Sequence, residues 1–153
     1  QFPSKAALMA GVVAELSRQR AASFRAALEG IAGPRERLLV MHDVAWELTM
    51  QPEYAAVLEI ALARRSDPDL SRETAAVFAR NEEMYRRWVV GLARKLGIRD
   101  TKRVENAREV STALMRGHVV DLAGGTATRE RNEVADALKA ISRAQLAAVL
   151  DGG

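Results

Sequence analysis

The chain has 153 residues and a mass of 16.7 kDa, a size that predicts one domain with its own buried core. Hydrophobic residues make up 48% of it, which excludes disorder of the whole chain, and the absence of cysteine excludes disulfide scaffolds, thiolate metal sites and cysteine nucleophiles. The 23 basic and 20 acidic residues leave a net charge of +3, which favours an ordinary solvated surface over a dedicated nucleic-acid face. We expect no membrane contact and a cytoplasmic location, because no apolar run approaches the ~20 residues that span a bilayer and no secretion signal opens the chain.

Apolar residues recur at spacings of three and four, and no segment alternates with period two, so the sequence predicts an all-α protein. Ser4 is placed to cap the first helix, and Pro34 and Pro52 open the second and third from their first turns. Gly97 is the expected C-cap of the fourth helix, and a glycine pair at 124–125 separates the last two. The short loops predict a six-helix antiparallel bundle with helices at 4–28, 34–50, 52–65, 70–96, 101–123 and 128–150.

The first ten residues read QFPSKAALMA, with Phe2, Lys5 and Leu8 in a Phe-x-x-Lys-x-x-Leu pattern. This segment resembles the one that closes the DNA-binding domain of the TetR family of bacterial transcriptional regulators and starts the helix leading into the regulatory domain. Six helices of these lengths also resemble that regulatory domain. The resemblance implies that residues 1–4 are the remnant of a DNA-binding domain and that residues 5–153 form an effector-binding and dimerisation domain.

The resemblance also implies a ligand-responsive transcriptional regulator, usually a repressor, whose helix-turn-helix would precede Gln1. Operator DNA would therefore be bound only through that missing N-terminal domain, because the recognition helix that reads base edges is not in this sequence. Lys5 matches a family position that contacts a DNA phosphate, a contact that positions the protein without specifying sequence. The alternative for Lys5 is an ordinary exposed lysine.

Two polar residues lie inside apolar stripes: His42 in the second predicted helix and Asn81 in the fourth. Both need a polar partner if buried. Either they are core residues satisfied by each other or by the backbone, or they face a cavity and orient a small molecule. The resemblance implies an effector in the middle of the helical domain. The candidate ligand-binding residues are His42, Trp46, Met50, Tyr54, Phe78, Asn81, Tyr85, Trp88 and Met115. We expect a small hydrophobic or aromatic effector, with a positive charge on it left open.

The last two predicted helices carry many small apolar residues, which allow close helix–helix approach, and the fifth is apolar on two sides. These stripes either bury only against the first four helices or also form a homodimeric four-helix interface, as the resemblance implies. The candidate interface residues are Val104, Ser111, Leu114, His118, Leu122, Val134, Leu138, Ile141, Gln145 and Ala148.

Catalytic and metal-binding patterns are missing from the sequence. It holds no Glu-x-x-His pair, only two histidines on separate predicted helices, and no phosphate-binding loop around its glycines. We therefore expect no enzyme activity, no metal and no cofactor. The alternative to a regulator is a stand-alone helical module that binds a ligand or a partner protein without binding DNA.

Overall fold

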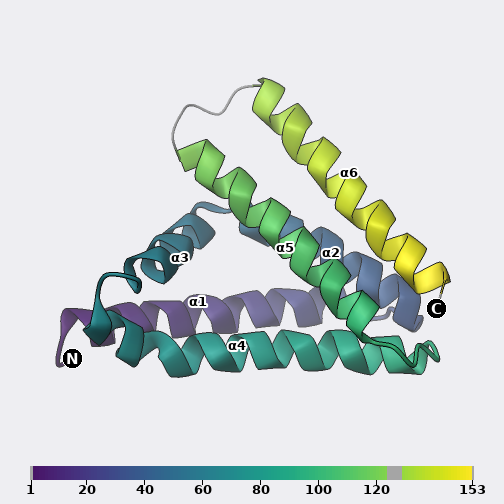
Figure 1. Cartoon of the computed structure of the whole chain (residues 1–153). Coiled ribbons are helices and arrows are strands. Elements are labelled where there is room, and N and C mark those ends of the chain that lie inside the picture. The colour runs from purple at the N-terminus through teal and green to yellow at the C-terminus, as the bar shows by residue number, and fades with distance from the viewer. Residues whose placement is uncertain (1, 124–128, 153) are drawn as a thin grey trace.

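The computed structural model describes residues 2–123 and 129–152, and for residues 129–131 the backbone alone. Within these ranges the chain forms six helices and no strand, so the predicted all-α class is confirmed (Figure 1). The helices are α1 (Lys5–Ala27), α2 (Pro34–Thr49), α3 (Pro52–Ala63), α4 (Pro68–Lys95), α5 (Lys102–Ala123) and α6 (Arg129–Asp151). None of them is long and apolar enough to cross a membrane.

Local chemistry explains where the helices begin. Ser4 is the N-cap of α1, and its hydroxyl accepts a hydrogen bond from the Ala7 amide at 3.0 Å. The fourth helix begins at Pro68, two residues before the predicted start, because the carboxylate of Asp67 caps it by accepting from the Leu70 amide at 2.9 Å. Proline fits this first position since its missing N–H would have no helical partner.

The helix ends are close to those predicted. The C-cap of α4 is Leu96, and Gly97 follows it with φ +80°, a left-handed conformation that favours glycine. Helix α3 ends at Ala63, two residues before the predicted end, while the other described ends agree within one residue. Gln1, the glycine pair at 124–125 and the predicted helix start at 128 lie outside the described residues.

The helices pack as a bundle in which α2 contacts all five other helices (Figure 1). Helices α1 and α4 lie side by side, and α5 pairs with α6. Helices α5 and α6 run antiparallel, as predicted (Figure 1). However, α1 and α4 run in the same direction, so the bundle is not antiparallel throughout. Their contacts advance together, from Ser17 with Asn81 to Phe24 with Trp88.

One cluster of buried apolar side chains, here called the packed core, joins α1, α2, α4, α5 and α6. It contains Phe24, Leu38, Leu39, Met41, Val89, Leu92, Ala93, Ile98, Val104, Ala107, Leu146 and Leu150. Helix α3 contributes none of these residues. The apolar stripes predicted on the other helices therefore converge on one core, as burial of apolar surface requires.

A polar network fastens α6 to α2. Nε of Arg143 lies 3.0 Å from both carboxylate oxygens of Asp43, and the Ser142 hydroxyl is 2.8 Å from Nε2 of His42. The indole N–H of Trp46 donates to the same hydroxyl at 3.2 Å. Ser142 is fully buried, so these bonds replace water that its polar group would otherwise need.

Candidate functional site

A cavity of about 750 Å³ lies between α1, α2, α3, α4 and α5, and one residue of α6, Leu146, also borders it. This volume is within the range of small-molecule sites, roughly 300–1,000 Å³. One wall is shared with the packed core, through Phe24, Leu38, Met41, Val89, Val104, Ala107 and Leu146. This part of the cavity is therefore apolar and closed by buried side chains.

Six of the nine predicted ligand-binding residues line this cavity. They come from four helices and are His42, Tyr54, Phe78, Asn81, Tyr85 and Met115. The structure thus brings together residues that are up to 73 positions apart, from His42 to Met115.

The other three predicted residues, Trp46, Met50 and Trp88, lie outside the lining. Trp46 is 2% exposed and anchors α6 through Ser142. Trp88 packs edge-on against Phe24, with ring centroids 6.3 Å apart, and joins α1 to α4. Met50 is the C-cap residue of α2. These side chains have structural roles. The spacing of apolar residues in the sequence cannot separate such roles from contact with a ligand.

His42 and Asn81 do not bond to each other. The amide of Asn81 donates to the Ser17 hydroxyl on α1 at 2.5 Å, whereas His42 bonds to Ser142 on α6. Both residues also line the cavity. Each residue therefore has a hydrogen-bond partner on another helix and also borders the cavity. The sequence analysis treated a satisfied core residue and a cavity residue as alternatives, whereas these two residues are both.

Burial lowers the pKa of His42, although the neighbouring carboxylate of Asp43, 3.2 Å from Nδ1, acts in the opposite direction. A neutral ring carries one N–H, and we assign it to Nδ1, which then donates to Asp43. Nε2 accepts from the Ser142 hydroxyl, which in turn accepts from the Trp46 N–H. This assignment gives every polar atom of the chain of bonds a partner.

Four arginines also line the cavity: Arg20, Arg64, Arg108 and Arg116. The sequence reasoning missed them because arginine is mostly an exposed residue. A signal was present for Arg20, which lies four residues after Leu16 and four before Phe24, on the apolar stripe of α1.

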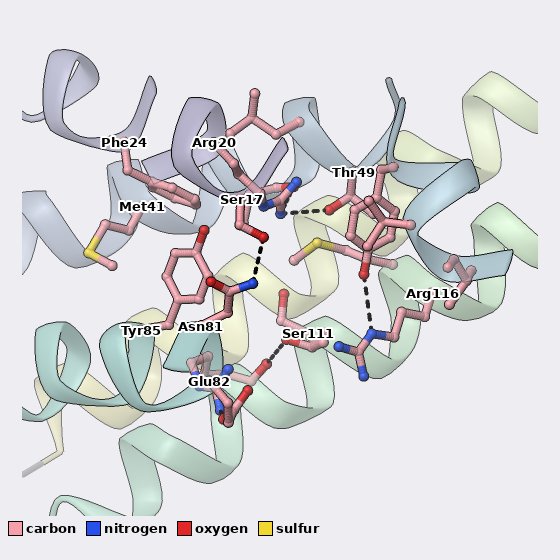
Figure 2. A pocket seen from close by; sticks show the side chains of 18 of the residues that line it. Ser17, Arg20, Phe24, Met41, Thr49, Asn81, Glu82, Tyr85, Ser111 and Arg116 are labelled. Carbon is pink, nitrogen blue, oxygen red and sulfur yellow. Dashed lines mark hydrogen bonds and ion pairs between the residues drawn. The ribbon is translucent and has the colours of Figure 1, made fainter. Parts of the chain in front are cut away.

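Arg20 is held in position at the cavity wall by residues of two other helices. Its guanidinium donates to the Thr49 hydroxyl at 3.0 Å (Figure 2). It also lies over the ring of Tyr54, 5.0 Å from the centroid. Nε of Arg116 donates to the hydroxyl of the same Tyr54 at 3.2 Å. Tyr54 therefore links two guanidinium groups, from α1 and α5, across the start of α3.

Two buried hydroxyl groups at the cavity have no hydrogen-bond partner among the described residues. They belong to Ser111 on α5, which is 4% exposed, and to Tyr85 on α4. Burial raises the pKa of Tyr85, while the positive charge of Arg20 and the proximity of its N–H groups to this hydroxyl act against that rise. No Arg20 N–H is close and aligned enough to count as a hydrogen bond to it. Unpartnered buried hydroxyls are costly, so they are uncommon in packed interiors.

Helix α3 forms the outer wall of the cavity through Tyr54, Val57, Leu58, Ala61 and Leu62. Its sequence, PEYAAVLEIALA, is highly apolar, yet none of its residues is buried and Leu62 is 49% exposed. Its inner face therefore borders the cavity, and its contacts with α1, α2 and α5 leave none of its residues buried.

The predicted interface residues fall into two groups. Val104, Ser111 and His118 are buried within the chain, and Leu114, Leu122 and Leu138 are partly buried. By contrast, α6 exposes Val134 (50%), Ile141 (63%), Gln145 and Ala148 along its outer face. Lys5 is exposed in the first turn of α1.

Among the described residues, no three acidic or histidine side chains are grouped so that they would hold a metal ion. The site is therefore described by its cavity, its arginines and its unpartnered hydroxyls.

No protein-family model, no curated protein and no solved structure matches this chain.

Proposed function

We propose that the chain is the effector-binding and dimerisation domain of a ligand-responsive bacterial transcriptional repressor similar to the TetR family. The observation that carries the proposal is that α1 lines the cavity with Leu16, Ser17, Arg20 and Phe24. The same helix begins with the Phe-x-x-Lys-x-x-Leu pattern that, in the resembled family, leads out of the DNA-binding domain. A ligand in the cavity would therefore touch the helix that carries the DNA-binding head.

The mechanism we propose is a shift between two placements of α1. A ligand that contacts α1, α3 and α4 in one placement better than in the other changes their populations. In a dimer, tilting α1 would change the spacing of two recognition helices, which must match half-sites about one helical turn apart. Ligand binding would then release operator DNA.

The dimer part of the proposal rests on the outer face of α6. Val134 and Ile141 are exposed there, flanked by the small residues Ala137, Ala144 and Ala148. Packing this face and the adjoining side of α5 against a second copy would bury the exposed side chains in a two-fold four-helix interface.

Sedimentation would test the dimer. We expect a mass twice the 16.7 kDa of the chain, and a shift toward the monomer in Ile141→Lys, which places a charge in the proposed interface. Ala76→Lys adds the same charge at an exposed position of α4 and should leave the mass unchanged. A monomeric wild type would refute this part.

Ligand binding can be tested with a neutral apolar fluorophore such as N-phenyl-1-naphthylamine. We expect saturable binding that is lost in Ala61→Trp, which fills the cavity from α3. The control Ala56→Trp adds the same ring at an exposed position of α3 outside the lining and should bind as the wild type does. Equal binding by both variants would place the ligand elsewhere.

The regulatory part is tested on protein isolated from its native source. A mass about 5 kDa larger than the chain, the size of a small helix-turn-helix unit, is expected for a DNA-binding regulator. That protein should lose operator affinity when the cavity is filled. A native mass of 16.7 kDa would favour the alternative, a stand-alone helical module that binds its ligand without DNA.

A further inference from the structure

The charges that line the cavity are unbalanced. Four arginines line it, against two carboxylates, Glu53 and Glu82. Glu82 is already paired with Arg108, and Glu53 is exposed in the first turn of α3. The structure pairs no carboxylate of the described residues with Arg20 or Arg64. The wall thus offers positive charge that the described part of the chain does not neutralise.

Arg20 is the best placed of these groups to meet a ligand. It is partly buried, and Thr49 and the stacked ring of Tyr54 hold its guanidinium in position. The Thr49 hydroxyl and the Ala45 carbonyl, 3.0 and 3.4 Å away, are neutral acceptors that both lie near one terminal nitrogen. A guanidinium has five N–H donors in a fixed plane, so donors remain for a planar anion such as a carboxylate.

The unpartnered hydroxyls provide a second, independent observation. Other buried or partly buried helical hydroxyls, those of Thr74 and Thr112, donate to the carbonyl one turn back. Ser111 makes no such bond, although it is 96% buried (4% exposed) and helical. In Figure 2, Arg20, Tyr85 and Ser111 point into the same space from α1, α4 and α5. Arg20 carries only N–H donors, and the Tyr85 and Ser111 hydroxyls can each donate as well as accept, so an anion placed among them would accept from all three.

Beyond these donors, the wall of the cavity becomes apolar. Phe24, Leu38, Met41, Val89 and Leu146 are buried there and belong to the packed core. On the outer side, Val57, Leu58 and Leu62 of α3 offer further apolar surface that is not packed. An apolar body as well as an acidic group is therefore needed to cover the lining.

We propose that the cavity binds an amphiphilic carboxylate, with its acid group on Arg20, Tyr85 and Ser111 and its apolar body along the core wall and α3. This inference deepens the proposed function and rests on it, since it names the chemical class of the effector. The sequence analysis expected a hydrophobic or aromatic effector and left open whether it carries a positive charge. The present inference specifies an effector that is anionic as well as apolar, and it excludes a cationic one.

The test compares three ligands with one tail and different head groups: decanoate, decanol and decyltrimethylammonium. Each is titrated against N-phenyl-1-naphthylamine bound to the full chain near neutral pH, where the carboxyl group is ionised. We expect the dissociation constant of decanoate to be at least about tenfold lower than that of decanol, a factor that corresponds to about 1.4 kcal/mol in binding free energy. The cation should bind most weakly of the three. This comparison uses the unaltered protein, so it does not depend on the folding of a variant.

The variant Arg20→Gln locates the acid group. It should weaken decanoate binding about ten- to a hundredfold, as expected for lost hydrogen bonds to a charged group, and leave decanol binding unchanged. The matched control is Arg18→Gln on the same helix, where the side chain is 71% exposed and paired with Glu15. The control should bind all three ligands as the wild type does.

The outcomes separate the two proposals. If the fluorophore binds in the cavity but decanol or the cation competes as well as decanoate, the carboxylate inference is wrong and the proposed ligand-binding function stands. If decanoate is preferred but Arg20→Gln retains the preference, the acid group lies elsewhere and the inference is equally overturned. If the fluorophore and all three ligands fail to bind, both the inference and the ligand-binding part of the proposed function are refuted.

Discussion

The packed core and the cavity are built along the same helices but differ in how their apolar side chains are used. Helix α2 belongs to both: Leu39 near its start is 7% exposed and lies in the packed core away from the cavity, whereas Leu48 near its end is partly exposed, packs against that core and borders the cavity. In the packed core every apolar side chain finds apolar neighbours from other helices. Around the cavity, apolar side chains such as Leu62 of α3 stay partly exposed, so their burial contributes less to folding.

Helix α3 shows what this difference teaches. It is the most apolar helix of the chain by sequence, yet it has no buried residue. Hydrophobicity therefore does not by itself place a side chain in the core; the neighbouring elements must close around it. Marginal packing of an apolar helix over a cavity is a common property of regions that move when a ligand binds.

The largest effect should come from truncating one leucine in each region. Leu39→Ala removes a buried side chain from the packed core, and we expect a loss of about 2–5 kcal/mol in the free energy of unfolding. Leu58→Ala makes the same truncation on α3, beside the cavity, and should cost less than about 1 kcal/mol, since little packing is lost. Urea denaturation measures both. Equal costs would show that the two regions are packed alike.

The next effect concerns the polar network that fastens α6 to α2. Ser142→Ala leaves the Trp46 N–H and the His42 ring nitrogen without their partner in a buried site, and we expect a cost of about 1–3 kcal/mol. The control Ser23→Ala removes an exposed hydroxyl on α1 and should change stability by less than about 0.5 kcal/mol. A similar effect in both variants would contradict a role for Ser142 in holding α6.

A smaller effect should appear as a dependence of stability on pH. Because burial lowers the pKa of His42 in the folded chain, the unfolded chain takes up the proton first as the pH falls. The stability due to the neutral ring is complete above the unfolded pKa, about 6.5, and is lost as the pH falls from there to the lower folded pKa. Below the folded pKa it changes no further.

His42→Gln removes the titrating group, which lines the cavity and bonds to Ser142 on α6. We expect the plot of unfolding free energy against pH to become flatter below about pH 6.5. Histidine NMR titration of the wild type gives the folded pKa directly. An unchanged slope in the variant would mean that other groups cause the pH dependence.

The smallest effect should come from Ser111→Ala, which removes an unpartnered hydroxyl from the cavity wall. In the polar network between α2 and α6 the loss of a bonded hydroxyl is destabilising, as argued for Ser142. Here we expect no loss, and a gain of at most about 1 kcal/mol, because a buried donor without a partner is removed. A loss of more than about 1 kcal/mol in thermal or urea unfolding would show that Ser111 is bonded in the folded protein.

Much of this protein could be predicted from the order of its residues. Spacings of three and four fix an apolar stripe on each helix, and Ser4, Pro34 and Pro52 mark helix starts by local hydrogen bonding and backbone geometry. Helix α4 begins two residues before the predicted start at residue 70, because Asp67 caps it and Pro68 opens it. Such signals act over a few residues and are therefore visible in the sequence.

Tertiary structure alone decided how these stripes are shared. It placed α1 parallel to α4, assigned Trp46 and Trp88 to packing, and turned Arg20, on the stripe of α1, toward a cavity. It also left Ser111 without a partner. A periodic pattern states which face of a helix is turned inward, but the atoms that meet that face come from distant parts of the chain. Whether the face is filled by side chains or borders a cavity depends on those atoms.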